Sequence, residues 1–191
     1  MMNRGLALAL WGLVCAPGFA QTALYGQKAK HYVNSLAPYV VSPQQIVDRM
    51  LEMADPRPGE TVYDLGSGDG RILITAVQRY HVKAVGIEIS DQLVQSAADR
   101  IQKLGLQNDA RVVHGDFLQM DLSPADVVTL YLATDSNAIL RPNLEKQLKK
   151  GARVVSHDYA VPGWKPALVD QDLPDARGHV IYLYQMPPKK K

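Results

Sequence analysis

Acidic residues stand at or just after the ends of three short β-rich segments of this sequence. Asp64 precedes the glycine cluster 66–70, Glu88 ends the run 84–88, and Asp116 follows Gly115. Carboxylates can accept hydrogen bonds from the hydroxyl and amino groups of a bound ligand. Ligands of open α/β sheets bind at the carboxyl ends of the strands. The pattern therefore predicts that these carboxylates converge on one small-molecule site.

The first of the three loops is Asp64-Leu65-Gly66-Ser67-Gly68-Asp69-Gly70. Its glycines let the backbone turn sharply and approach a ligand closely. A dinucleotide fingerprint requires Gly or Ala five positions after its first glycine, and Arg71 stands there instead. A carboxylate directly before the glycines also suits an amino group better than a pyrophosphate. The loop therefore favours the methionine end of S-adenosylmethionine over a nicotinamide dinucleotide.

The other two loops complete the pattern of this cofactor. Glu88 comes 22 residues after the first glycine of the cluster, where a carboxylate can accept both ribose hydroxyls. Asp116 can accept a hydrogen bond from the adenine amino group, and Ile89 or Phe117 can pack on the ring. Taken alone, Gly-Asp is an ordinary turn and a glutamate an ordinary surface residue. Their order along the chain favours binding of S-adenosyl-L-methionine.

Alternating strands and helices must position these loops. Ser42 before Pro43 is expected to cap a first helix, which ends near Asp55. Near the C-terminus, the runs 167–171 and 179–185 are separated by a loop too short for a crossover helix, so they should form an antiparallel hairpin. The pattern predicts an α/β fold, namely a doubly wound, Rossmann-like, seven-stranded sheet with a C-terminal antiparallel hairpin. The remaining predicted strands are 61–65, 84–88, 111–114, 126–132 and 152–157, and the remaining helices 71–80, about 90–104 and about 136–149.

The first 20 residues differ from the rest of the chain. Arg4 precedes the apolar run 6–16, and small residues at 18 and 20 complete a signal-peptide pattern. The run is short for a membrane span, and an uncleaved anchor is the alternative. We therefore expect a signal peptide or anchor over 1–20, a linker over 21–35, a catalytic domain over 36–186 and a basic tail over 187–191. Export to the periplasm follows from the signal, with membrane-anchored and cytoplasmic locations as alternatives.

Composition narrows the function classes. The chain has 191 residues, with 21 Lys and Arg against 19 Asp and Glu, which fits one domain and gives no argument for nucleic-acid binding. The one cysteine, Cys15, lies in the N-terminal segment, so the body has no disulfide and no thiolate chemistry. The five histidines show no His-x-x-x-His spacing, and the sequence therefore predicts no metal site.

Several motifs together resemble one family. Over residues 36–185 the chain resembles small microbial broad-specificity protein-lysine methyltransferases and the mitochondrial lysine methyltransferases of inner-membrane proteins. This resemblance implies that Tyr39 borders the transferring methyl group and that Tyr131 and Thr134 line a lysine channel; packing of both tyrosines is the alternative. It also implies that Asp64, Gly66, Gly68, Glu88 and Asp116 hold the cofactor. The motifs are Pro38-Tyr39-Val40-Val41-Ser42-Pro43, the glycine loop with Arg71, the run 84–88, Arg153-Val154-Val155-Ser156-His157 and Trp164-Lys165-Pro166.

The expected activity is therefore S-adenosylmethionine-dependent protein-lysine N-methylation by a monomer. The segment 131–134 departs from the Asp/Asn-Pro-Pro-Tyr motif of enzymes that methylate nucleobases or glutamine amides, which argues against those substrates. Because the net charge is only +2, we expect no nucleic-acid partner. Membrane association would come only through the N-terminal segment. Two alternatives stay open: a small-molecule O- or N-methyltransferase of the same fold, and a catalytically idle exported binding module.

Overall fold

The computed structural model describes residues 40–171 and 178–190. The predicted export segment, the linker and Tyr39 lie outside these described residues. The helices are α1 Gln44–Ala54, α2 Arg71–Tyr80, α3 Asp91–Lys103 and α4 Thr134–Gln147, with a 3-10 turn, η1, at Phe117–Gln119. The strands are β1 Thr61–Leu65, β2 Lys83–Glu88, β3 Ala110–His114, β4 Val127–Leu130, β5 Arg153–His157, β6 Trp164–Lys165, β7 Leu168–Asp170, β8 Ile181–Gln185 and β9 Lys189–Lys190.

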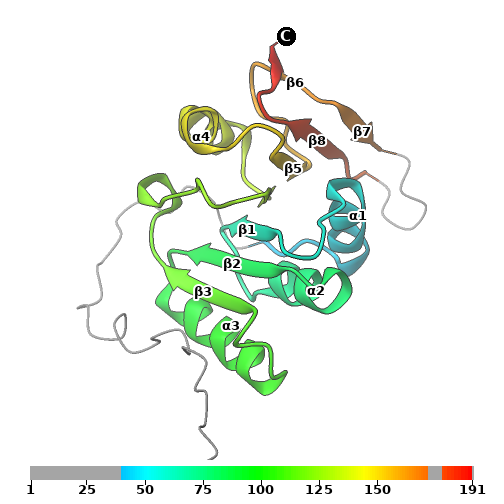
Figure 1. Cartoon of the computed structure of the whole chain (residues 1–191). Coiled ribbons are helices and arrows are strands. Elements are labelled where there is room, and N and C mark those ends of the chain that lie inside the picture. Colours follow the sequence, from blue (N-terminus) through cyan, green and yellow to red (C-terminus); the bar gives the residue numbers. More distant parts are fainter. Residues whose placement is uncertain (1–39, 172–177, 191) are drawn as a thin grey trace, which may run out of the picture. The chain divides into compact units, whose positions relative to one another are not determined.

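Seven of the strands form one sheet in the order β3-β2-β1-β4-β5-β8-β7 (Figure 1). The first five strands are parallel, whereas β8 runs antiparallel to both β5 and β7. The predicted seven-stranded, Rossmann-like sheet with an antiparallel C-terminal hairpin is therefore confirmed. The chain reverses its direction across the sheet between β1 and β4, which is where ligands bind in this architecture.

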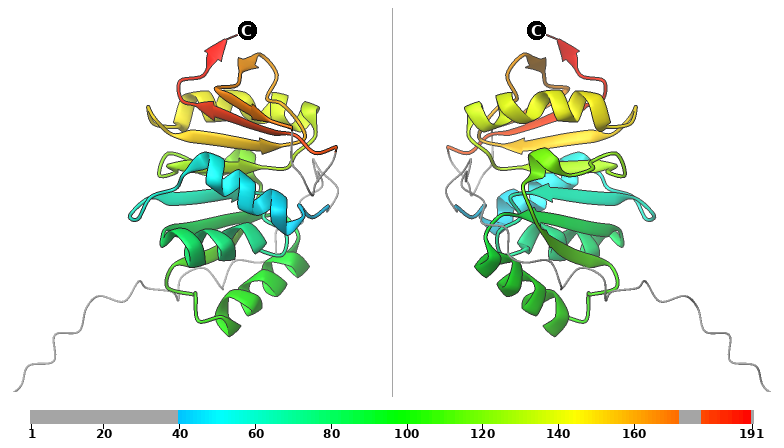
Figure 2. Two further views of the ribbon diagram at one scale, coloured as in Figure 1. Left: turned by 90° about the vertical axis from the view of Figure 1, so that its right-hand side faces the viewer. Right: turned by 90° about the vertical axis from the view of Figure 1, so that its left-hand side faces the viewer.

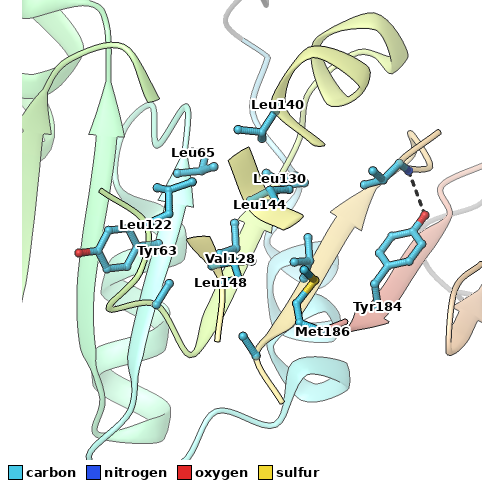
Figure 3. Close-up of a cluster of buried hydrophobic side chains, with 14 of the residues drawn as sticks. Tyr63, Leu65, Leu122, Val128, Leu130, Leu140, Leu144, Leu148, Tyr184 and Met186 are labelled. Carbon is cyan, nitrogen blue, oxygen red and sulfur yellow. Dashed lines mark hydrogen bonds between the residues drawn. The ribbon is translucent and has the colours of Figure 1, made fainter. Parts of the chain in front are cut away.

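Helices cover both faces of the sheet, and Figure 2 shows α1 and α4 on opposite sides of it. One face carries Val62, Val127 and Val155, which pack against α1 and α2. The other face carries a larger cluster, in which α4 contributes Leu140 and Leu144 (Figure 3). This alternation along each strand is what a sheet buried on both faces requires. Asp64, Thr129 and His157 each come two residues after one of these valines. Because side chains alternate along a strand, they lie on the same face of the sheet, the face covered by α1.

Local sequence explains the helix that follows Glu88. Ser90 is the N-cap of α3, and its hydroxyl accepts a hydrogen bond from the backbone N–H of Leu93 at 3.4 Å. Asp91 lies in the first turn, and Arg100 and Lys103 lie in the last, which suits the helix dipole. The helix therefore begins directly after β2 and fixes the position of the loop between them.

Three details differ from the sequence prediction. Ser42 does not cap α1: the N-cap is Pro43, without a side-chain hydrogen bond, because the Ser42 hydroxyl bonds to His157 instead. α4 begins at Thr134, two residues earlier than expected. Two residues of the basic tail, Lys189 and Lys190, pair as β9 with β6, a contact that no local pattern indicates. Among the described residues, no helix has the length and hydropathy needed to cross a membrane.

Candidate cofactor and acceptor site

The glycine loop leaves β1 through three left-handed residues. Gly66, Gly68 and Gly70 have φ of 81°, 52° and 75°, values that side chains with a Cβ rarely adopt. The backbone N–H groups of Gly66 and Ser67 donate to the carbonyl of Ile87 at 2.8 and 3.1 Å. The loop is therefore fixed against the carboxyl end of β2.

A fourth glycine, Gly86 of β2, makes this close approach possible. A Cβ at this position would lie 2.6 Å from Ser67 Cβ and 2.7 Å from Leu73 Cδ1. Real side chains essentially never come so near, so only glycine fits without a shift of the loop or of α2. Sequence reasoning missed Gly86, although an isolated glycine inside a strand often marks a close backbone approach.

Glu88 connects the glycine loop to the start of α3. Its Oε2 accepts the N–H of Gly68 at 2.9 Å, and its Oε1 accepts those of Ile89 and Ser90, each at 2.9 Å. The side chain is buried. A carboxylate has about four acceptor positions, so three are used by the protein. Glu88 therefore shapes the site as well as offering a remaining acceptor position to a ligand hydroxyl.

Asp64 is a buried carboxylate on the same side of the sheet. It is 4% exposed, and Thr129 Oγ1 donates to its Oδ1 at 2.6 Å. Burial raises the pKa of Asp64 from 3.8 to about 7; the Thr129 hydrogen bond opposes this shift, and the charge of Glu88 adds to it. A buried carboxylate with a raised pKa favours a cationic ligand, because a positive charge beside it offsets the cost of ionisation.

The third loop lies beside the second. The N–H of Gly115 donates to the Glu88 carbonyl at 2.9 Å, and His114 Nε2 lies 3.0 Å from the Ile89 carbonyl oxygen. Asp116 caps the 3-10 turn by accepting the N–H of Leu118 at 2.9 Å. Phe117 is half-buried against the core. The structure thus connects the loops through Glu88, while the adenine roles of Ile89, Asp116 and Phe117 remain predictions.

The residues of the three loops fit the predicted cofactor. Ser67 Oγ is buried and has no hydrogen-bond partner among the described residues, and a buried hydroxyl normally has one. S-adenosylmethionine carries an ammonium group and a sulfonium, which match the buried Asp64 carboxylate. Its ribose hydroxyls match the remaining acceptor position of Glu88. These donors and acceptors therefore suit a cationic nucleoside better than an anionic dinucleotide.

Tyr131, the residue directly after β4, lies in a cluster of aromatic and imidazole rings. Its ring stacks on His157 with centroids 3.9 Å apart and lies 6.2 Å from the ring of Tyr159. Burial, followed by the charge of Asp158, raises the pKa of Tyr131, so the phenol keeps its proton near pH 7. Burial lowers the pKa of His157 to about 4, so this imidazole is also neutral near pH 7. Thr134 is exposed at the start of α4.

Ser42, which precedes α1, forms hydrogen bonds to His157 at the carboxyl end of β5 and to Arg71 in the segment that follows β1. Its hydroxyl lies 2.8 Å from His157 Nδ1, and its carbonyl accepts a hydrogen bond from Arg71 Nη1 at 2.9 Å. Arg71 is held in turn by Asp69, with Nη2–Oδ2 at 2.9 Å. The residue that breaks the dinucleotide fingerprint therefore has a structural role of its own. Trp164 of the last motif is buried, and its indole N–H donates to Glu145 Oε1 at 2.7 Å.

The fold and these loops define a class I S-adenosylmethionine-dependent methyltransferase, and comparison with known proteins agrees. The family profile described as "ANTKMT methyltransferase domain" matches residues 64–168. A protein-lysine N-methyltransferase of Saccharolobus islandicus (strain REY15A) is 47% identical over 148 residues, which are 77% of this chain and 92% of that relative. The chain belongs to this family of methyltransferases.

Two further relatives agree with this assignment. The adenine nucleotide translocase lysine N-methyltransferase of Mus musculus is 33% identical over 168 residues, 87% of this chain and 69% of that relative. A crystal structure from Salinibacter ruber, described as an RNA methyltransferase in complex with S-adenosyl-L-homocysteine, is 40% identical. The two structures superpose with a TM-score of 0.74, and the matched region covers 80% of this chain and 97% of the Salinibacter ruber chain. The predicted cofactor is therefore confirmed at the level of the family.

Proposed function

We propose that this protein transfers a methyl group from S-adenosylmethionine to lysine side chains of proteins. The observation that carries the proposal is the 47% identity to a protein-lysine N-methyltransferase across 92% of that relative. The site supports it, since Tyr131 directly follows β4 and Tyr159 follows the adjacent parallel strand β5, so both rings lie at the carboxyl edge of the sheet, 6.2 Å apart. Aromatic faces and neutral hydroxyls hold an amine or a methylated ammonium well.

The cofactor supplies an activated methyl group on its sulfonium. The task of the chain is to orient that group, exclude water and hold the acceptor amine in line with it. Asp64, the glycine loop and Glu88 would orient the cofactor. Tyr131 would contact the lysine, and its ring is kept in place by the stack on His157. Tyr39, outside the described residues, is proposed to border the methyl group because of its place in the family motif.

RNA is the second candidate substrate, because the Salinibacter ruber relative is described as an RNA methyltransferase. The near-neutral charge of this chain argues against it. The experiment is incubation of the purified protein with methyl-labelled S-adenosylmethionine and three acceptor pools: proteins, RNA and small metabolites. We expect label in the protein pool, resistant to ribonuclease. Label only in RNA or only in low-molecular-weight products would overturn the lysine proposal.

We further propose that residues 1–20 act as an export signal or an anchor, on the strength of the charge and hydropathy pattern alone. Mass spectrometry of the N-terminus of the protein purified from its native cells tests this directly. A first residue at or near Gln21 would indicate cleavage. An intact N-terminus recovered with the membrane fraction would indicate an anchor, and an intact N-terminus in the soluble fraction would contradict both.

A further inference from the structure

Residues His157, Asp158 and His179 bring three ligand atoms together at the end of β5. His157 Nε2 lies 2.9 Å from His179 Nδ1 and 3.3 Å from Asp158 Oδ2, and His179 Nδ1 lies 3.1 Å from the same oxygen. The histidines are 22 residues apart in the sequence. They meet because β5 and β8 pair antiparallel, with His157 opposite Ile181. The sequence predicted no metal site because histidines brought together by strand pairing have no short spacing along the chain.

We propose that this cluster is a binding site for a divalent transition-metal ion such as Zn²⁺. Ligand atoms around a tetrahedral zinc at about 2.0–2.1 Å lie about 3.3 Å from one another. The three distances are within a few tenths of an ångström of that value, so small side-chain adjustments would complete the site. Two imidazole nitrogens and one carboxylate favour zinc and its neighbours over magnesium or calcium, which prefer oxygen ligands.

A hydrogen bond outside the cluster orients the imidazole of His157 toward the other two ligand atoms. His157 Nδ1 lies 2.8 Å from Ser42 Oγ. When this nitrogen donates to the hydroxyl, Nε2 carries no proton and its lone pair points at the cluster. His157 is 0% exposed, whereas the side chains of His179 and Asp158 are 30% and 22% exposed. One side of the cluster is therefore open to solvent, which leaves room for a water as fourth ligand.

The carboxylate is held as firmly as the imidazole. Asp158 has φ of 59°, in the left-handed region, which costs energy for a residue with a Cβ. Its Oδ1 accepts the N–H of Val180 at 3.0 Å, and its own N–H donates to the Val180 carbonyl at 2.7 Å. These bonds cross from β5 to the residues before β8. The ion would therefore join the end of β5 to the residues before β8, and one of its ligands, His157, is the imidazole on which Tyr131 stacks.

Isothermal titration of the tag-free, chelator-treated full chain with zinc chloride tests this proposal. We expect one ion per chain with a submicromolar Kd, and with Co²⁺ the visible absorption bands of a four-coordinate ion. The His179→Ala variant should weaken Zn²⁺ binding at least 100-fold. The His81→Ala variant, which changes an exposed histidine at the end of α2, should bind like the wild type. Because His179 is half-buried, its variant should keep the wild-type circular dichroism spectrum.

The competing explanation is a hydrogen-bonded cluster that never takes up metal. Absence of saturable binding of both Zn²⁺ and Co²⁺, or binding that is equal in His179→Ala and wild type, would overturn the proposal. An Asp158→Asn variant gives a second readout, since loss of one carboxylate should weaken binding while leaving both imidazoles. The measurement does not depend on methyl transfer, so its outcome is separate from that of the lysine proposal.

Discussion

The backbone N–H of Gly68 donates to Glu88 Oε2 at 2.9 Å, which joins the glycine loop to the end of β2. The same carboxylate accepts two further N–H groups at the start of α3. One side chain therefore fixes the relative positions of two of the three cofactor loops. Glu88 therefore has a structural role in addition to the ribose contact that we propose for it.

Replacement of Glu88 by alanine should impair both binding and folding. The change leaves three backbone N–H groups without their acceptor, at a cost of about 1–3 kcal/mol for each that stays buried. We expect at least a tenfold loss of affinity for S-adenosylmethionine and a lower melting temperature without ligand. Calorimetry and thermal denaturation measure the two effects.

The Glu88→Gln variant separates the two roles, because its amide retains one acceptor oxygen. It should recover part of the stability and less of the affinity. Asp99→Asn, an amide exchange at an exposed position on α3, is the matched control and should change neither quantity. A Glu88→Ala variant with wild-type affinity would show that the carboxylate has no part in cofactor binding.

Affinity for S-adenosylmethionine should depend on pH through Asp64. The folded-state pKa of about 7 lies above the ordinary 3.8, so the stability due to this group is full below pH 3.8 and is lost as the pH rises through 7. A cationic ligand favours the ionised form. Cofactor affinity should therefore fall by up to about tenfold per pH unit below 7.

Two variants assign this pH dependence to Asp64. Thr129→Val removes the hydrogen bond that lowers the pKa, so the midpoint of the affinity curve should move to higher pH. Asp64→Asn should bind weakly and with little pH dependence between pH 6 and 8. An unchanged midpoint in Thr129→Val, measured by calorimetry, would contradict the assignment.

Replacement of Gly86 by alanine should displace the glycine loop. The added methyl group would lie within 2.7 Å of Ser67 and Leu73, and overpacking of this kind costs about 1–3 kcal/mol. We expect a lower free energy of unfolding together with weaker cofactor binding. Gly59→Ala is the control: nothing lies within 4 Å of its added methyl group, so it should lose stability through its positive φ alone and keep its cofactor affinity.

Removal of the buried hydroxyl of Ser67 should not destabilise the protein, in contrast to the Glu88 and Gly86 replacements. Because Ser67 Oγ has no partner among the described residues, removing it should leave the ligand-free protein equally or more stable. If the hydroxyl serves the cofactor, Ser67→Ala should also bind S-adenosylmethionine more weakly. Thermal shift with and without cofactor tests both parts, and a stability loss without ligand would be evidence against an unsatisfied hydroxyl.

Tyr131 should affect the acceptor and not the cofactor. Tyr131→Ala removes the ring that stacks on His157, and we expect at least a tenfold lower kcat/KM for the protein substrate with unchanged affinity for S-adenosylmethionine. Tyr131→Phe keeps the stack and should be affected less. Equal losses of cofactor affinity and kcat/KM in Tyr131→Ala would place this residue on the cofactor side.

Helices and strands that depend on local sequence patterns could be predicted from the sequence. The strand 61–65 and the helix 71–80 were predicted with the bounds that the structure has, because apolar periodicity and the glycine cluster specify both. The order of the loops was also sufficient to predict the class of cofactor. Glu88, predicted as a ribose ligand, was placed at the correct strand end.

Contacts between distant segments could not be derived in this way. Ser42 reads locally as a helix cap, yet it bonds to a histidine 115 residues away. The approach of His157 to His179 depends on the register of β5 against β8, and Gly86 matters only because a loop from another part of the chain lies on it. Such relationships depend on tertiary packing, which single-sequence patterns do not encode.

The position of the transferred methyl group tests lysine methylation by this protein most directly. The protein is incubated with S-adenosylmethionine carrying a deuterated methyl group and a mixture of proteins, and the digested products are sequenced by tandem mass spectrometry. We predict deuterated methyl groups on lysine Nζ atoms, with much less label at subsaturating S-adenosylmethionine when Glu88→Ala replaces the wild type. Deuterium found on other side chains only, or in no protein at all while RNA or small molecules are labelled, would contradict protein-lysine methylation.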